Sequence, residues 1–385
     1  MKKPLDAVVV GSGPCGALAA RSLAARGWRV ALVDRHAFPR QKVCGDALLP
    51  DAFDILRDQG LADAVVGAGH PSSVLSVFSP GGYEVRVSGD FLTVRREVLD
   101  VLLHRAAIQL GAEPIVAAVS SVSENPDGVC VEFRSGPTLQ ARACILATGA
   151  DTRLLRSLQP VISPAPTAVA SRCYVQSSRP LDRLVVTYDR GLGPAYAWIF
   201  PVGEGLFNVG VGSVYRSQKR FDHRSLFERF TTVFPEARAL MATGQIVSPL
   251  RSAPLRCGLD RHALRPGRLF LGAGEAAGST FPFTGEGIGK AMATGLLAAD
   301  AVHAFLGGEG EGLDSYASAV LRLEPRYRAY SAAHRLLDYP RLMDLAAWRL
   351  QKSHWLAGRL SGVLQEEEDP RSLFSIAGLL GSFFR

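Results

Sequence analysis

The stretch LDAVVVGSGPCGALAARSLAARGWRVALVD, residues 5–34, decides the fold of this chain. An apolar, valine-rich run leads into the loop Gly11-x-Gly13-x-x-Gly16, an Ala/Leu-rich helix follows, and a second apolar run ends at Asp34. This order predicts a βαβ unit whose glycines permit a sharp turn, close approach to a pyrophosphate and tight helix packing. The head of the helix would face the phosphates, and Asp34 would bind the ribose hydroxyls. We therefore expect a bound dinucleotide; the alternative is a glycine-rich turn without a ligand.

Two later segments favour FAD over NAD. Residues 92–113 have the apolar spacing of a helix and begin with the arginine pair 95–96. Either arginine can pair with a phosphate or the flavin edge, and the alternative is a solvated start of the helix. Residues 141–158 contain a buried strand that ends in Ala147-Thr148-Gly149, a turn where backbone must lie close to the nucleotide.

A third segment, 267–302, predicts a strand, a glycine loop and a helix of small residues. Its Gly272-x-Gly274 resembles the start of a second dinucleotide fold, but the strand with a terminal acid that should follow is missing. We therefore expect the loop Gly274–Gly278 to close over the ribityl chain. The helix that begins near Gly285 would point its positive end at the flavin pyrimidine.

Composition indicates an ordinary globular protein and neither a disordered nor a fibrous one. Apolar residues make up 47% and charged residues 21% of the 385 residues, which is ordinary globular usage. The chain has six cysteines without a C-x-x-C pair, so we expect free thiols and no metal site. No secretory start and no apolar run of spanning length are present, so we expect a cytoplasmic protein. The net charge of +7 is mixed along the chain and does not indicate nucleic-acid binding.

The motifs occur in the order found in one flavoprotein family. After the first glycine loop come KVCGDALLP, RREVLD, ATGAD, YAWIFPVGEGLFNVGVG and GEAAGSTFPFTGEGI. Over residues 1–300 the chain resembles the geranylgeranyl reductase family, a branch of the para-hydroxybenzoate-hydroxylase-like flavoproteins. The resemblance implies an FAD-dependent reductase and places Cys44 and Gly45 against the isoalloxazine ring. Cys44 would line the site or donate a proton there.

The run Tyr196-x-Trp198-x-Phe200-Pro201 is similar to the substrate-cavity motif of isoprenoid reductases. Its alternation places the three rings on one face of a strand, as an aromatic wall beside the flavin or as an ordinary sheet core. We expect Cys44, Tyr196 and Trp198 to be catalytic and the run 196–201 to bind substrate.

The expected cofactor-binding residues share positions in the motifs above: Gly11, Gly13, Pro14, Cys15, Gly16, Asp34, Arg35, Cys44, Gly45, Arg96, Ala147, Thr148, Gly149, Gly274, Glu275, Pro282, Gly285, Gly287 and Ile288.

The chain departs from the family pattern at several positions. Glu275 stands where the family usually has aspartate, and Asp46 stands where a second glycine is commoner. Asp151 is followed by Thr152 and not by the glycine of related hydroxylases, which puts direct capture of NADPH in their manner in doubt. The W-x-W-x-I-P motif of flavin-dependent halogenases is absent, which disfavours halogenation.

The fold class expected is mixed α/β: a Rossmann-like FAD-binding domain interleaved with an antiparallel or mixed β-sheet substrate domain, plus a C-terminal helical extension. The FAD domain would take residues 1–70, 92–160 and 262–305, the substrate domain 71–91 and 161–261, and the extension 306–385. A hairpin turn is expected at the glycine pair 81–82, and a helix from about Arg224 to Val233.

The C-terminal extension shows an amphipathic pattern. The apolar side of its expected helix consists of Leu342, Ala346, Leu350, Ala357, Leu360 and Leu364. The other side consists of Arg341, Trp348, Lys352, Trp355 and Arg359. This side could rest on the inner face of a membrane as a peripheral contact. Docking of the extension onto the protein body is the interpretation that we favour.

Three functions fit this reading. The first is reduction of a carbon–carbon double bond in a prenyl or other apolar substrate by hydride transfer from reduced FAD. The second is a monooxygenase or oxidase that tailors a secondary metabolite, and the third is a flavin-binding protein without turnover. Because a second nucleotide domain is missing, electrons would come from NAD(P)H, a ferredoxin or a separate flavin reductase.

Overall fold

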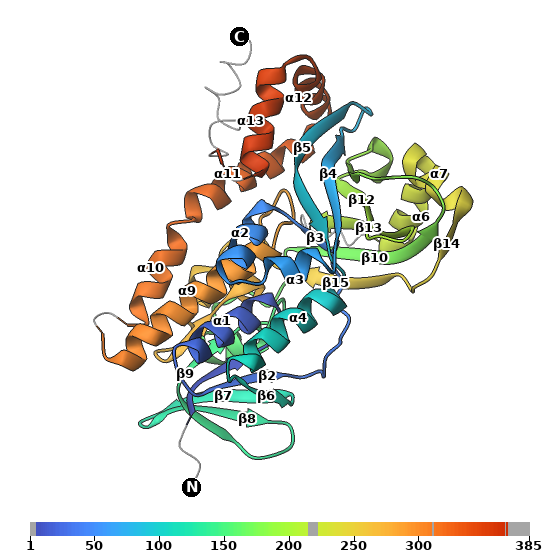
Figure 1. Cartoon of the computed structure of the whole chain (residues 1–385). Coiled ribbons are helices and arrows are strands. Elements are labelled where there is room, and N and C mark those ends of the chain that lie inside the picture. The colour runs from blue at the N-terminus through green and yellow to red at the C-terminus, as the bar shows by residue number, and fades with distance from the viewer. Residues whose placement is uncertain (1–4, 215–221, 310–311, 366, 369–385) are drawn as a thin grey trace. The chain divides into compact units, whose positions relative to one another are not determined.

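In the computed structural model, which describes residues 5–214, 222–309, 312–365 and 367–368, the chain folds into two units (Figure 1). Each unit is assembled from separated segments of the chain. Unit 1 takes the chain up to Gln41, Glu97–Pro166 and Arg256–Tyr327. Unit 2 takes Lys42–Arg96, Thr167–Leu255 and the chain from Arg328 onward.

Unit 1 is built on a largely parallel sheet in the order β6-β2-β1-β9-β8-β7, with β16 beside β9. Its strands are β1 (Leu5–Val10), β2 (Val30–Asp34), β6 (Glu113–Val116), β7 (Val119–Asn125), β8 (Gly128–Phe133), β9 (Leu139–Leu146) and β16 (Phe270–Gly272). Its helices are α1 (Pro14–Ala25), α4 (Arg96–Gln109), α5 (Arg153–Leu158), α8 (Arg261–Leu264), α9 (Ile288–Gly307) and α10 (Asp314–Leu321), with the 3-10 turn η2 (Gly274–Ala277). Because β1 pairs in parallel with both β2 and β9, the predicted βαβ unit is confirmed.

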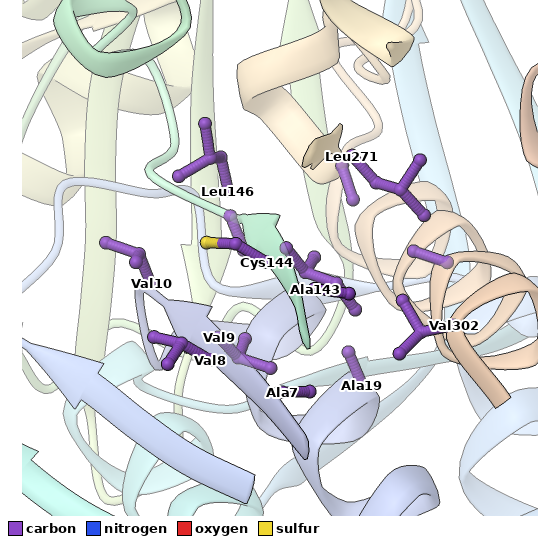
Figure 2. Close-up of a cluster of buried hydrophobic side chains, with 14 of the residues drawn as sticks. Ala7, Val8, Val9, Val10, Ala19, Ala143, Cys144, Leu146, Leu271 and Val302 are labelled. Atoms are coloured by element: carbon purple, nitrogen blue, oxygen red, sulfur yellow. The ribbon is translucent and has the colours of Figure 1, made fainter. Parts of the chain in front are cut away.

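The core of unit 1 explains the unbroken apolar runs of its sequence. Strand β1 is covered on both faces, so Val8, Val9 and Val10 are all buried (Figure 2). Small residues such as Ala19 of α1 pack in the same cluster as Val302 of α9 (Figure 2). This buried core holds the strands of unit 1 in place, and the glycine loops follow at the ends of these strands.

Unit 2 is built on a mixed, mostly antiparallel sheet in the order β14-β10-β13-β12-β11-β4-β5-β3, with β15 beside β10. Its strands are β3 (Ala47–Leu48), β4 (His70–Phe78), β5 (Glu84–Thr93), β10 (Ala168–Ser177), β11 (Leu184–Thr187), β12 (Ala195–Pro201), β13 (Leu206–Val214), β14 (Gly244–Ile246) and β15 (Arg251–Leu255). Its helices are α2 (Pro50–Asp58), α3 (Ala62–Val66), α6 (His223–Val233), α7 (Pro235–Thr243), α12 (Pro340–Lys352) and α13 (His354–Leu364), with the 3-10 turns η1 (Arg190–Leu192) and η3 (Arg335–Asp338). Helix α11 (Glu324–His334) contains the boundary between the units.

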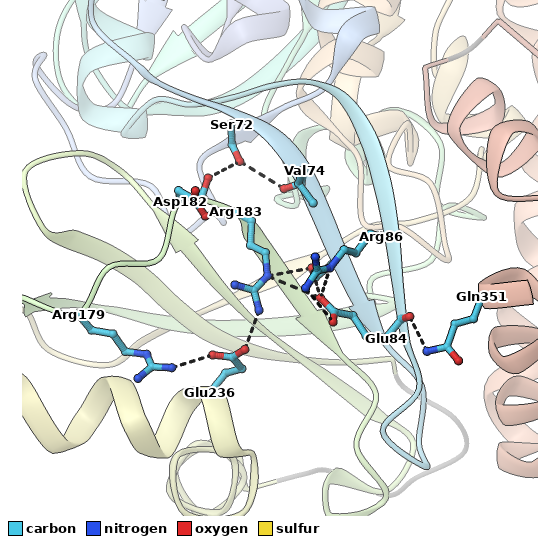
Figure 3. A network of polar contacts seen from close by, with 10 residues as sticks. Ser72, Val74, Glu84, Arg86, Arg179, Asp182, Arg183, Glu236 and Gln351 are labelled. Carbon is cyan, nitrogen blue, oxygen red and sulfur yellow. Dashed lines mark hydrogen bonds and ion pairs between the residues drawn. The ribbon is translucent and has the colours of Figure 1, made fainter. Parts of the chain in front are cut away.

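The local expectations for unit 2 are confirmed. Strands β4 and β5 form the predicted hairpin around Gly81 and Gly82, and α6 lies where a helix was expected. A polar network joins α7 to this hairpin (Figure 3). Arg183 donates to Glu236 of α7 at 2.7 Å and to the Ser76 hydroxyl of β4 at 3.0 Å.

The two units divide the chain differently from the predicted domain segments. Residues 42–70 belong to unit 2, because β3 pairs with β5 in the second sheet. The C-terminal region is also not a separate extension in the described residues. Its helices α12 and α13 pack on β5, where Ala347 and Leu364 meet Val85 and Val87 (Figure 1). The extension beyond Glu368 lies outside the described residues.

The expected single amphipathic helix is two helices. The break falls at Ser353, whose hydroxyl caps α13 by accepting a hydrogen bond from the backbone N–H of Leu356 at 3.3 Å. The prediction that Leu342 packs against the body is wrong, because this side chain is 50% exposed. The packed side of α12 instead includes Asp344 and Ala347. The mixed α/β fold with a Rossmann-like unit and a second sheet is confirmed.

Candidate functional site

The glycine loop of unit 1 has no room for side chains. Gly11 has a φ of +102°, and a Cβ placed on it would lie 2.2 Å from the carbonyl oxygen of Ala147. A Cβ on Gly16 would lie 1.8 Å from the carbonyl oxygen of Gly11. Helix α1 then begins at Pro14, after Gly13, and no described side chain caps this end. The first amide groups of α1 are therefore left for a ligand with negative charge.

Asp34 ends β2 and is anchored beside this loop. Its carboxylate accepts hydrogen bonds from the backbone N–H groups of Ser12 and His36, each at 3.0 Å. Arg40 lies 3.5 Å from the Asp34 carboxylate and 3.2 Å from that of the buried Asp100. These contacts fix the position of the Asp34 carboxylate at the strand end, where it could accept hydrogen bonds from a ribose.

The turn after β9 lies at the neighbouring strand end. Ala147 continues the parallel ladder by donating to the carbonyl of Val10 at 2.8 Å. The Thr148 hydroxyl donates to the carbonyl of Asp151 at 2.5 Å, and Gly149 has a φ of +66°. Arg35, an expected cofactor contact, lies 3.8 Å from the Asp151 carboxylate.

The second glycine loop packs tightly against the first helix. Gly274 donates to the Thr294 hydroxyl at 3.0 Å, and a Cβ on it would lie 2.9 Å from that of Cys15. A Cβ on Gly295 of α9 would lie 2.4 Å from the carbonyl oxygen of Cys15, so α1 and α9 touch through their backbones. Burial raises the pKa of the Cys15 thiol to about 12, so this group is not a reactive thiolate.

The expected flavin helix begins three residues later than Gly285, at Ile288, with Gly287 as its N-cap. The segment before it is a closed turn: Phe281 donates to the carbonyl of Glu286 at 2.9 Å, and Gly285 donates to that of Phe281 at 3.1 Å. Pro282 lies inside this turn. No described side chain caps the start of α9.

Glu275, where the family usually has aspartate, has a defined contact. Its carboxylate accepts a hydrogen bond from the backbone N–H of Arg256 at 3.4 Å. The longer side chain therefore reaches back to the segment before α8 within the same unit.

In unit 2, the Cys44–Gly45–Asp46 turn lies against the aromatic strand. A Cβ on Gly45 would lie 3.1 Å from the Phe200 ring and 3.6 Å from Nε1 of Trp198. Asp46 is fully buried and has a φ of +66°, a backbone conformation that is strained for any residue but glycine. The structure thus brings together the sequence-predicted turn and the sequence-predicted rings.

Buried hydrogen bonds hold Asp46 in this conformation. Its carboxylate accepts from the Tyr174 hydroxyl at 2.6 Å, from the Asn208 amide at 2.7 Å and from the backbone N–H of Arg96 at 3.2 Å. Burial raises the pKa of Asp46, and these donors oppose that shift. The guanidinium of Arg172 stacks 4.2 Å from the centre of the Tyr174 ring.

Asn208 links the turn to the aromatic strand. Its amide nitrogen donates to the Cys44 carbonyl at 2.8 Å as well as to Asp46, and its amide oxygen accepts from Nε1 of Trp198 at 2.9 Å. All three partners depend on one fully buried side chain. Loss of that amide would leave buried polar groups without partners.

The aromatic rings lie flat over glycines of the neighbouring strand. In the antiparallel register, Tyr196 faces Gly212, Trp198 faces Gly210 and Phe200 faces Asn208. A Cβ on Gly210 would lie 2.2 Å from the Trp198 ring, and one on Gly212 would lie 2.3 Å from the Tyr196 ring. The rings of Tyr196 and Trp198 are 5.9 Å apart and those of Trp198 and Phe200 are 6.3 Å apart. The strand therefore presents a continuous aromatic surface on one face.

The Cys44 thiol carries its proton at neutral pH. Burial raises its pKa, the guanidinium of Arg96 acts in the opposite direction, and the carboxylate of Asp46 adds to the rise. A thiol in this state keeps its proton and is a poor nucleophile.

Sequence reasoning missed Tyr174, Arg172 and Asn208, and it treated Asp46 only as a departure. One signal was present: in NVGVG, residues 208–212, alternate positions carry a polar residue and two glycines. In an antiparallel pair this pattern matches the alternate aromatic residues of 196–200. The partners on β10 had no such signal.

Comparisons with known proteins match segments of both units. The family model described as an FAD binding domain matches residues 4–144. The menaquinone reductase of Mycobacterium tuberculosis is 31% identical over 88% of this chain and 85% of its own length. This chain belongs to the geranylgeranyl reductase family. The geranylgeranyl diphosphate reductase of Rhodobacter capsulatus is 29% identical over 78% of this chain and 75% of its own length.

The fold of this family member is also that of a solved structure. A geranylgeranyl bacteriochlorophyll reductase-like protein from Thermoplasma acidophilum has a TM-score of 0.80 and 18% identity, and the match covers 96% of this chain and 98% of that protein. The family is one of FAD-dependent oxidoreductases. The loop at Gly11, the uncapped end of α1 and the carboxylate of Asp34 fit FAD. In the described part of the chain, no helix is both long and apolar enough to cross a membrane.

Proposed function

We propose that this oxidoreductase reduces a carbon–carbon double bond in the prenyl chain of a lipid, and that a menaquinone is the first substrate to test. The observation that carries the proposal is the aromatic surface of β12, which lies over Gly210 and Gly212 and against the turn that holds Cys44. The names of the relatives support it, since one is a menaquinone reductase and another a geranylgeranyl diphosphate reductase. A flat apolar surface beside a protonated thiol suits an isoprenoid double bond.

FAD would be held by unit 1 through the glycine loop, the amide groups of α1 and α9, and Asp34. The turns at Ala147–Gly149 and Gly274–Glu275 would follow the rest of the cofactor. Cys44 and Gly45 are proposed to contact the flavin ring, as the resemblance implies, and Arg96 is proposed to pair with the flavin edge or a phosphate. When bound in its reduced form, FAD supplies the hydride.

The residues of unit 2 would orient the substrate and complete the reduction. Tyr196, Trp198, Phe200 and Pro201 would hold the prenyl chain and exclude water. In the reduction, Sγ of Cys44 would give its proton to one alkene carbon while the other carbon would receive the hydride, so that the double bond would become a single bond with one added hydrogen on each carbon. The resulting thiolate is stabilised by the positive charge of Arg96 and then takes a proton from water.

Asp46 and Asn208 have a supporting role in this proposal. Asp46 adopts a strained backbone conformation, and its three donors hold it there. Asn208 fixes the Cys44 carbonyl and the Trp198 indole from one side chain. These bonds would keep Cys44 and the aromatic surface at fixed positions relative to each other while the substrate is reduced.

The electron donor and the location are also proposals. NAD(P)H, a ferredoxin and a separate flavin reductase are the three donors to compare, each by the rate at which it bleaches the bound flavin. We propose a cytoplasmic location, supported by the six cysteines, which are all free thiols.

An anaerobic experiment tests the function. The purified protein is loaded with FAD, reduced, and mixed with a geranylgeranyl lipid that carries no quinone ring, because a quinone ring could itself reoxidise the flavin. Return of the oxidised flavin spectrum, with no oxygen present, is the expected result. If no alkene substrate reoxidises the flavin, the proposal is wrong. A product that carries label from ¹⁸O₂ would instead establish a monooxygenase, and absence of any redox response to substrate would leave a flavin-binding protein without turnover.

A further inference from the structure

Large apolar side chains are concentrated on the surface of one short segment. Leu342, Leu345 and Trp348 lie on α12 and Tyr339 is the residue just before it; their exposed fractions run from 58% for Tyr339 to 38% for Trp348. Trp355, the second residue of α13, is 42% exposed. The other exposed large apolar residues of the described chain are spread over distant positions, such as Val66, Leu110 and Ile246. We call Tyr339, Leu342, Leu345 and Trp348 the α12 face.

The α12 face is exposed on a helix that is firmly held on its other side. Asp344 accepts hydrogen bonds from the Ser79 hydroxyl at 2.7 Å and from the backbone N–H of Gly81 at 2.5 Å, and it pairs with Arg190. Gln351 donates to the carbonyl of Glu84 at 2.9 Å (Figure 3). The polar groups on the buried side of the helix therefore have partners within unit 2, and the exposed apolar residues of α12 are a persistent surface feature.

The exposed charged residues of α12 itself are positive, although Asp338, just before Tyr339, is exposed and acidic. Arg341 and Lys352 are exposed, and residues 341, 345, 348 and 352 recur at the spacing of one helix face. The ammonium of Lys352 lies 4.7 Å from the centre of the Trp348 ring, and the guanidinium of Arg359 lies 5.0 Å from that of Trp355. The one acidic residue of α12, Asp344, is buried and paired.

We propose that the α12 face seats the protein on an anionic lipid bilayer. Leucine and tryptophan side chains would enter the boundary between headgroups and acyl chains, and Arg341 and Lys352 would meet lipid phosphates. A second copy of the chain fits this face less well, because two such faces would bring the same positive charges together. The inference deepens the proposed function by stating where a prenyl lipid would be met, and its test needs no turnover.

Vesicle sedimentation tests the proposal on the full chain loaded with FAD. The probes are vesicles of phosphatidylcholine alone and vesicles of phosphatidylcholine mixed with phosphatidylglycerol. The wild-type protein should sediment with the mixed vesicles, and raised salt should weaken this binding. The double variant Leu345→Gln, Trp348→Gln should lower the affinity at least about tenfold. The matched control is Ile246→Gln, Val247→Gln, which alters an exposed apolar pair on the same unit. It should bind as the wild type does.

Retained FAD and an unchanged melting temperature show that each variant is folded. Equal binding by the wild type and the α12 double variant would overturn the proposal, as would absence of wild-type binding. A concentration-dependent dimer that the double variant abolishes would instead make a second copy the occupant. Binding that appears only when the chain ends at Glu368 would make the C-terminal segment the occupant. A protein that binds vesicles but reduces no prenyl lipid would keep this inference and disprove the proposed function.

Discussion

The glycine loop of unit 1 and the aromatic strand of unit 2 both depend on glycine, but for different neighbours. At Gly11 the missing side chain makes room for backbone, since a Cβ there would lie 2.2 Å from the carbonyl oxygen of Ala147. At Gly210 it makes room first for a ring, since a Cβ would lie 2.2 Å from the indole of Trp198, and also for the carbonyl oxygen of Ser171 at 2.6 Å. The first is part of a contiguous motif, whereas the second acquires its meaning only from strand pairing. In the proposed function, the first region would hold the cofactor and the second the substrate.

The largest effect is expected at Gly11. Gly11→Ala should abolish FAD retention, because the new methyl group collides with rigid backbone at the cofactor loop. Gly27→Ala is the matched control: Gly27 also has a positive φ, +84°, but nothing lies within 4 Å of its Cβ position. The control should cost about 1–2 kcal/mol of stability and keep FAD. Flavin absorbance of the two purified variants measures how much FAD each of them retains. FAD bound normally by Gly11→Ala would break the comparison.

A smaller effect is expected at Cys44, on turnover alone. Cys44→Ala should lower the rate of flavin reoxidation by substrate about 100-fold while FAD stays bound. In the wild type the rate should be constant at low pH and should fall as pH rises through the raised pKa of Cys44, because only the protonated thiol donates. The alanine variant should lose this dependence. The same pH profile in both proteins would exclude Cys44 as the proton donor.

Gly210 sharpens the comparison on the substrate side. Gly210→Ala should displace the Trp198 ring and reduce turnover about tenfold, with FAD content unchanged. Gly358→Ala, at a helical glycine with open space around it, should leave turnover unchanged. Steady-state assays with one prenyl lipid compare the two. Loss of FAD from Gly210→Ala would show that the two regions are not separable in function.

Asn208 should matter for stability as well as for position. Asn208→Leu removes the donor to Cys44 and Asp46 and the acceptor for Trp198. We expect a loss of about 3 kcal/mol in the free energy of unfolding, since buried polar groups lose their partners. Urea denaturation measures the loss. A variant as stable as the wild type would mean that water replaces the amide.

The smallest effect is expected at Asp344. Burial acts to raise the pKa of this carboxyl, but the bonds from Ser79, Gly81 and Arg190 outweigh it and hold the pKa below its usual range. A lowered pKa in the folded state stabilises the protein above the unfolded-state pKa, and this stability is lost as pH falls through the folded-state pKa. Asp344→Asn should therefore cost about 1 kcal/mol at neutral pH and less in acid. A pH-independent difference in melting temperature would contradict this assignment.

The contrast between the two regions also explains what the sequence could predict. The βαβ unit, Asp34 and the turn at Ala147 follow from periodicities and spacings within short segments, so they were predictable. Tyr174 and Arg172 contact the Cys44 turn only because β10 lies beside β13. The order of strands in a sheet cannot be deduced from the local sequence pattern. The break at Ser353 was missed because one serine capping bond interrupts an otherwise regular apolar spacing. Leu342 was misplaced for a different reason: the buried side of α12 carries Asp344, whose polar contacts no apolar pattern indicates.

The most direct test of the central claim is the mass of the product after a single anaerobic turnover. The reduced protein is mixed with less than one equivalent of menaquinone, and the lipid is extracted and analysed by mass spectrometry. The account predicts a prenyl chain that has gained one H₂ at one double bond, from wild-type protein and not from Gly11→Ala. A lipid of unchanged mass, or one that is reduced only at its quinone ring, would contradict it.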